Sequence, residues 1–128
     1  MPDSTPTANV PENLPAGAPN FVHLRLHTEF SIVDGLVRMK PLLSRTRELN
    51  MPAVAVTDLA NMFGLIKFYS GALEAGIKPL CGCDVLVKSA EGQAETRLLL
   101  LAKDRAGYLN LSKLISTIYT GSQARADA

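Results

Sequence analysis

Hydrophobic and polar residues alternate in the first regular part of the chain. Apolar side chains occupy every second position from Val22 to Leu26 with polar side chains between them, which predicts a strand over residues 21–28. Leucines then recur at helical spacing over residues 36–49, which predicts a helix. Residues 53–58 begin as a continuous apolar run, and such a run is typical of a strand buried on both faces of a parallel sheet.

The rest of the chain continues this order of elements. Residues 64–75 have one apolar helical face, and residues 78–87 and 97–102 predict two strands separated by a polar turn. Asp104 can cap a last helix with its own apolar stripe. The alternation predicts an α/β fold with mainly parallel strands joined by right-handed crossovers.

The composition divides the chain into three parts. Five of the eight prolines fall within residues 1–20, where small and polar residues fill the gaps, so we expect a disordered proline-rich tail there. Residues 21–120 carry the periodic pattern, and 128 residues are enough for one domain. The last stretch, residues 121–128, is small and polar, and we expect it to fray.

Charge and cysteine content narrow the class of protein. Lys and Arg number 13 and Asp and Glu 12, so a net charge of +1 gives no overall attraction for nucleic acid, and contact with DNA would come only through a larger protein or its partners. Cys81 and Cys83 lack zinc-site spacing and are poorly placed for a disulfide, which favours reduced thiols in a cytoplasmic protein. No apolar run is long enough to cross a membrane, and the first residues do not form a secretory signal.

Polar side chains gather where the first two predicted strands end. His27 and Asp34 follow the first strand and Asp58 ends the second, which suggests a site at the carboxyl-end face of a barrel-like fold. Each residue also has a plainer interpretation. Asp34 precedes Gly35 and can be a turn residue, Asp58 can cap the next loop, and His27 can be a hydrogen-bonded structural histidine.

Four stretches, in order, resemble the N-terminal polymerase-and-histidinol-phosphatase (PHP) domain of bacterial DNA polymerase III alpha subunits: residues 23–35, 56–69, 75–84 and 100–116. The resemblance covers residues 21–120 and implies a distorted βα barrel, of which this chain holds a truncated part. It also implies a role in DNA replication as part of a DNA-directed DNA polymerase. The nucleotidyl-transfer site of that enzyme is expected on a palm domain beyond this sequence.

Metal-competent members of the family are expected to hold two or three cations for phosphoester hydrolysis, with histidines and acids at the strand ends. Where those members have histidines, this chain has Arg25, Leu59 and Arg97. Arginine cannot release its proton to ligate a cation, and leucine offers no lone pair. We therefore predict no catalytic residue, no cofactor, and a metal-free cluster in which the two arginines pair with acids of a vestigial site made by His27, Asp34, Asp58 and Asp84.

Two main functions follow from these residues. In the first, the chain is a scaffold that holds the proofreading exonuclease subunit and other polymerase III holoenzyme subunits, as the resemblance implies. In the second, it is a divalent-metal-dependent phosphoesterase with the four residues of the vestigial site as ligands. A generic α/β module is a third possibility that four ordered motifs disfavour. The first function also predicts that Asp58→Ala leaves a buried arginine unpaired, at a cost of ~3–5 kcal/mol.

Overall fold

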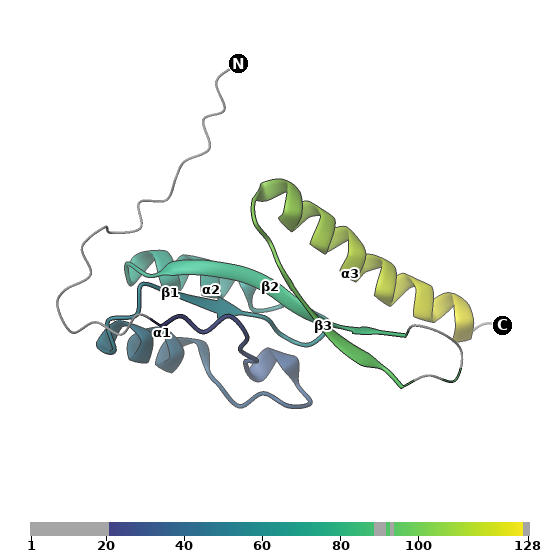
Figure 1. Ribbon diagram of the computed structural model, residues 1–128, viewed down its shortest axis with the longest axis horizontal. Coiled ribbons are helices and arrows are strands. Elements are labelled where there is room, and N and C mark those ends of the chain that lie inside the picture. The colour runs from purple at the N-terminus through teal and green to yellow at the C-terminus, as the bar shows by residue number, and fades with distance from the viewer. Residues whose placement is uncertain (1–20, 89–91, 93, 127–128) are drawn as a thin grey trace, which may run out of the picture.

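The computed structural model describes residues 21–88, 92 and 94–126, so the predicted tail over residues 1–20 lies outside the described part (Figure 1). The described elements, in chain order, are η1 (Glu29–Ser31), α1 (Met39–Glu48), β1 (Ala53–Val56), α2 (Leu65–Glu74), β2 (Lys78–Val87), β3 (Thr96–Leu101) and α3 (Arg105–Ala126). The mixed α/β composition predicted from the sequence is confirmed.

The three strands form one sheet in the order β1-β2-β3. β1 and β2 are parallel, with Ala53 opposite Lys78, as predicted. β2 and β3 are antiparallel, with Gly82 opposite Leu101, so the prediction of a mainly parallel sheet is wrong for this pair. The reason is the short connection between the two strands: a parallel return needs a crossover of about a dozen residues or more, whereas a short loop closes an antiparallel hairpin. Barrel closure remains a prediction.

The predicted strand over residues 21–28 is wrong as a regular element, although the segment lies beside β1. The amide of Ala55 donates to the His23 carbonyl and that of Thr57 to the Leu26 carbonyl, each at 2.9 Å. The acceptors are three residues apart and the donors only two, so one extra residue interrupts the ladder as in a bulge. The amide of Leu26 bonds to the Thr57 side chain at 2.9 Å instead of a backbone carbonyl.

Two apolar clusters cover one face of the sheet and leave the opposite face to polar residues. Helices α1 and α2 cover β1 through a core of Met39, Leu43, Val54, Val56, Phe68, Ala72 and Ile77. Helix α3 covers β2, where Leu111 and Ile115 pack on Cys83 and Val85. Because side chains alternate along a strand, the residue between those two, Asp84, points to the opposite face.

Helix α3 continues to Ala126, whereas we expected the chain to fray from Gly121; residues 127–128 lie outside the described part. Asp104 caps its start, as predicted, by accepting a hydrogen bond from the Gly107 amide at 2.8 Å. Among the helices that the structure describes, none combines the length and the apolar character needed to cross a bilayer.

Candidate functional site

Asp84 is the centre of a polar cluster on the free face of the sheet. Its side chain is fully buried, and its Oδ2 atom accepts a hydrogen bond from Arg25 Nε at 2.8 Å. The same oxygen lies 2.6 Å from Nε2 of His27. Arg25 and His27 reach it from the segment beside β1, since their side chains alternate with those of Leu24 and Leu26. The other oxygen, Oδ1, is buried and has no hydrogen-bond partner in the described part of the chain.

Asp34 extends the cluster toward β3. Its Oδ1 atom lies 2.9 Å from Nδ1 of His27, and its Oδ2 atom accepts a hydrogen bond from Arg97 Nη1 at 3.3 Å. Desolvation raises the pKa of Asp34, but the hydrogen bond and charge of His27, followed by those of Arg97, outweigh it and lower the pKa below the ordinary 3.8. Arg25 and Arg97 thus each lie against a carboxylate, and His27 joins the two pairs.

Asp58 belongs to a separate hydrogen-bonding group. It is buried, with 2% of its surface exposed. It accepts hydrogen bonds from the Thr28 amide at 2.6 Å, the Thr28 hydroxyl at 2.9 Å and the Ser31 hydroxyl at 2.8 Å. The expected pairing of Asp58 with an arginine is therefore wrong, because the turn after Thr28 brings two hydroxyl groups against the carboxylate first. Sequence reasoning missed these two partners, although a Thr and a Ser soon after a polar strand end were the available signal.

The segment between these two groups is a tightly closed loop, in which the Glu29 amide donates to the Val37 carbonyl at 2.9 Å. A γ-turn centred on Ile32 has a φ of 65°, and the Val33 amide donates to the Ser31 carbonyl at 2.7 Å. A β-branched residue with positive φ is strained, so the surrounding hydrogen bonds must hold this turn in place. Ser31 contributes by accepting a hydrogen bond from the Leu59 amide at 3.1 Å.

Gly35 is needed where this loop passes the end of the preceding segment. A Cβ atom there would collide with the carbonyl oxygen of Thr28. The glycine therefore allows the chain to return past Thr28 and brings Asp34 within reach of His27. The predicted turn at Asp34–Gly35 is in this position.

The chemistry of these residues does not fit a divalent cation. Both ring nitrogens of His27 face carboxylate oxygens, and a ring nitrogen that donates a proton has no lone pair for a metal. The guanidinium of Arg25 forms an ion pair with Oδ2 of Asp84, so this oxygen already has a positively charged partner. Leu59, beside Asp58, offers no ligand atom. Within residues 21–88, 92 and 94–126, no group of three or more His, Cys, Asp or Glu side chains is arranged to hold a metal ion.

The two cysteines lie outside the cluster. Cys83 is buried, and its thiol contacts the Asp58 carbonyl oxygen at 3.3 Å. Burial raises the pKa of Cys83 to about 11, and burial also raises the pKa of Cys81. A thiol with a raised pKa is a poor nucleophile and a poor metal ligand at neutral pH. Both thiols are free, which agrees with the expectation of reduced cysteines.

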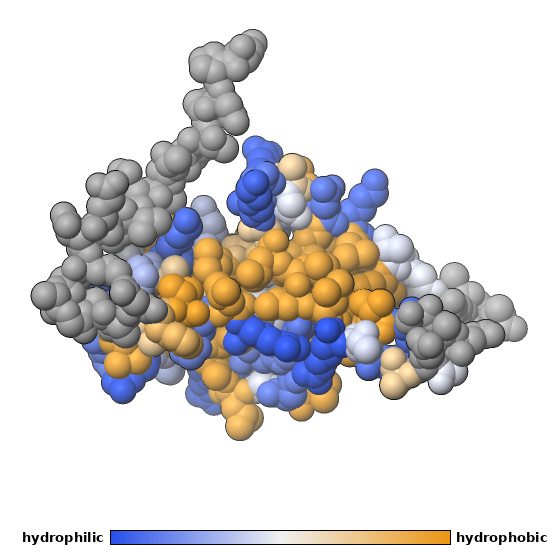
Figure 2. All heavy atoms as spheres, viewed as in Figure 1, coloured by the Kyte–Doolittle hydropathy of each residue, from blue (hydrophilic) through white to orange (hydrophobic). Residues whose placement is uncertain are grey.

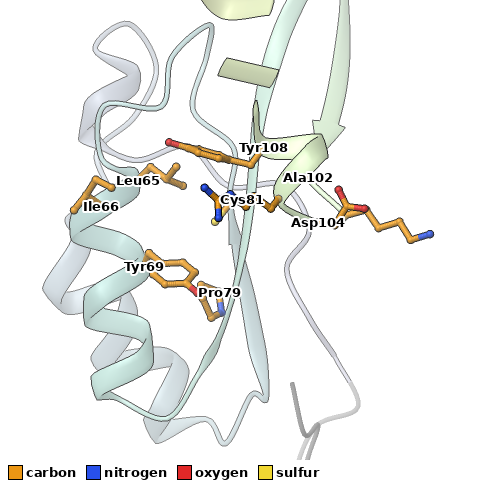
Figure 3. Close-up of a pocket in the computed structure, with 10 residues that line it drawn as sticks. Leu65, Ile66, Tyr69, Pro79, Cys81, Ala102, Asp104 and Tyr108 are labelled. Carbon is orange, nitrogen blue, oxygen red and sulfur yellow. The ribbon is translucent and has the colours of Figure 1, made fainter. Parts of the chain in front are cut away.

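A cavity of about 470 Å³ opens on the helix-covered side, between α2 and the start of α3 (Figure 3). Tyr69 and Tyr108 extend toward it from the two helices, and Pro79 and Cys81 of β2 form its floor. None of the residues in the polar cluster lines it. The cavity and the candidate chemistry are therefore on different faces of the sheet.

Known proteins resemble this chain both in sequence and in fold. The chain matches the PHP domain family over residues 23–127. It is 54% identical over 109 residues to the DNA polymerase III subunit alpha of Pseudomonas aeruginosa, an alignment that covers 84% of this chain and 9% of that protein. It is 49% identical over 102 residues to the same subunit of Vibrio cholerae, covering 79% of this chain and 9% of that protein. The chain thus spans less than a tenth of the length of these curated relatives.

The fold is similar to that of an amidohydrolase from Chromobacterium violaceum, with a TM-score of 0.60 and 24% sequence identity. The similarity covers 83% of this chain and 36% of the amidohydrolase chain. At this identity the likeness shows a shared fold and not a shared activity.

Proposed function

Because the chain belongs to the PHP domain family, as its match over residues 23–127 shows, we propose that it is the N-terminal PHP region of a bacterial DNA polymerase III alpha subunit. In this role it acts in DNA replication as a metal-free scaffold. The identity to two alpha subunits supports the first part of the proposal. The chemistry of the polar cluster supports the second part.

The contact between Arg25 and Asp84 carries the argument for a metal-free site. The Asp84 carboxylate is fully buried, and a buried carboxylate needs a compensating positive charge or hydrogen bonds. Arg25 supplies both through its Nε atom at 2.8 Å, although half of the Arg25 side chain is exposed. A guanidinium keeps its charge at all ordinary pH values, so this compensation needs no cation.

The proposed partners follow from the proposed identity. As part of an alpha subunit, the domain would belong to the polymerase III holoenzyme in the bacterial cytoplasm and bind the proofreading exonuclease subunit. DNA would be bound by other parts of the subunit, since the net charge of this chain is only +1. A pull-down of the purified chain with the exonuclease from the same organism tests the proposed binding. If the folded chain does not bind the exonuclease, this part of the proposal is contradicted.

Metal content and hydrolysis test the scaffold assignment against the phosphoesterase alternative. We expect less than stoichiometric zinc or manganese by elemental analysis, no hydrolysis of a model phosphodiester, and the same thermal midpoint with and without a chelator. Stoichiometric metal together with hydrolysis would establish the phosphoesterase instead.

A pair of histidine variants isolates the effect of the guanidinium. Arg25→His places an imidazole beside Asp84. Arg38→His is the control, because it places an imidazole at the start of α1, where Arg38 has no side-chain capping bond. If Arg25 excludes cations, added zinc should raise the thermal midpoint of the first variant and leave the second and the wild type unchanged. An equal shift in all three proteins would contradict this explanation.

A further inference from the structure

We propose that helix α3 fixes the position of the buried Asp84 from the opposite face of the sheet, through the hydroxyl group of Tyr119. The contact passes through the β1–α2 loop (residues 57–64), which Tyr119 holds on one side and which holds the Asp84 backbone on the other. The polar cluster is therefore coupled to the placement of α3. This inference is independent of the replication role, because every contact in it joins described residues of this chain.

Tyr119 reaches the β1–α2 loop because of its place on the helix. Leu111, Ile115 and Tyr119 are spaced by four residues, so they lie along one face of α3. Leu111 and Ile115 pack on β2, and Met62 of the loop packs against the same cluster. At the far end of this face, Tyr119 Oη donates a hydrogen bond to the Ala60 carbonyl oxygen at 2.9 Å.

The backbone of the β1–α2 loop is bonded directly to that of Asp84. The Ala60 amide donates to the Asp84 carbonyl oxygen at 2.7 Å, and the Asp84 amide donates to the Asp58 carbonyl oxygen at 3.0 Å. These two bonds form the bridge between Leu59 and Asp84. Ala60 thus makes both contacts, since its carbonyl group accepts from α3 and its amide donates to the residue at the centre of the polar cluster.

The left-handed conformation of Ala60 makes the loop dependent on its contacts. The φ of Ala60 is 54°, a value that residues other than glycine rarely adopt because their Cβ atom crowds the backbone. Such a residue keeps this conformation only where the surrounding structure holds it. The bond from Tyr119 is one of the contacts that do so, because it fixes the Ala60 carbonyl group.

The hydroxyl group adds direction to packing that is otherwise apolar. Figure 2 shows apolar side chains gathered in a broad band across the face over β2, β3 and α3. Attraction between apolar surfaces has no preferred direction, whereas a hydrogen bond requires one donor to face one acceptor. Removal of the Tyr119 hydroxyl group therefore leaves α3 packed on the sheet but releases its hold on Ala60.

The side chain of Arg25 reports whether the coupling reaches the polar cluster. Arg25 Nε donates to Asp84 Oδ2 at 2.8 Å, on the face of the sheet that α3 does not cover. Tyr119→Phe keeps the ring and removes the hydroxyl group, so we expect shifted NMR signals for the Ala60 and Asp84 amides and for the Nε–H group of Arg25. An unchanged Arg25 signal in the folded variant would overturn the proposal.

Tyr108→Phe is the matched control. Tyr108 lies on the same helix and is 36% exposed, against 47% for Tyr119, and its hydroxyl group has no hydrogen bond among the described residues. We expect this variant to leave the Arg25 Nε–H signal unchanged. Equal shifts in the two variants would overturn the proposal, because the hydrogen bond to Ala60 would then not be the cause.

A double-mutant cycle in urea measures the coupling independently. Changes at residues that share no contact usually multiply in their effects on the unfolding equilibrium constant, to within about twofold. We expect Tyr119→Phe alone to raise that constant by about three- to tenfold. In an Arg25→Gln background, where Asp84 has already lost its guanidinium partner, this effect should be at least about threefold smaller. Tyr108→Phe and Arg25→Gln should simply multiply, and simple multiplication for the Tyr119 pair would overturn the proposal.

Discussion

Replacing Asp58 by alanine should destabilise the fold through its hydroxyl and amide partners. The Asp58 carboxylate accepts hydrogen bonds from the Thr28 amide, the Thr28 hydroxyl and the Ser31 hydroxyl, and Thr28 and Asp58 are almost completely buried. The truncated side chain leaves the Thr28 amide without an acceptor in a site that water does not reach. The turn held by Ser31 also loses its connection to the end of β1.

The size of the effect can be worked from these contacts. A buried donor left without a partner costs about 1–3 kcal/mol, and each hydroxyl can rotate toward another acceptor, which limits its loss to about 1 kcal/mol. Relief from burying the Asp58 charge offsets part of the sum. We therefore expect Asp58→Ala to lower the free energy of unfolding by about 3 kcal/mol, which corresponds to roughly 12–24 °C in the thermal midpoint of a domain of this size.

Urea unfolding followed by circular dichroism measures this change, with the midpoint falling and the slope unchanged. Asp104→Ala is the matched control, because Asp104 is an exposed carboxylate whose one cap bond to Gly107 should be worth about 1 kcal/mol. If Asp58→Ala unfolds at the same urea concentration as the wild type, or if Asp104→Ala is the more damaging change, the hydrogen-bonding argument is wrong.

Three further predictions follow from the site and its surroundings. The pKa of Asp34 is lowered in the folded state, so its contribution to stability is present above the ordinary pKa of 3.8 and is lost as the pH falls below it; Asp34→Asn should reduce stability at neutral pH and flatten the acid side of the stability profile. Cys83, with a pKa of about 11, should react with a thiol reagent at pH 8 only upon unfolding, and fast labelling in the native protein would contradict its burial. Gly35→Ala should cost ~1–3 kcal/mol by thermal melting because its Cβ meets the Thr28 carbonyl, whereas Gly121→Ala, in open space on α3, should be neutral or stabilising by up to ~1 kcal/mol.

Periodicity predicted the regular elements well. The strand expected over residues 78–87 has the bounds of β2, and the helix expected over residues 64–75 is α2, shorter by one residue at each end. These segments bury a continuous apolar face, so hydrophobic spacing alone specifies them. The resemblance to the PHP family, carried by ordered motifs, is also confirmed.

Contacts between distant segments were harder to predict from the sequence. The extra residue between the His23 and Leu26 acceptors breaks the first ladder, and an alternating pattern cannot reveal such a bulge. The structure places Arg97 against Asp34 and Arg25 against Asp84, but Asp58 bonds to Thr28 and Ser31. Which acid meets which donor depends on how the loop after Thr28 closes, and residue type alone does not determine that.

The convergence of Arg25 and His27 on one oxygen of Asp84 has an evolutionary consequence. A lineage that acquired an imidazole in place of Arg25 would lose the permanent charge beside a fully buried carboxylate. Such a chain would fold less well than its parent unless a bound cation supplied the missing charge. The guanidinium of Arg25 is therefore hard to replace by a single substitution.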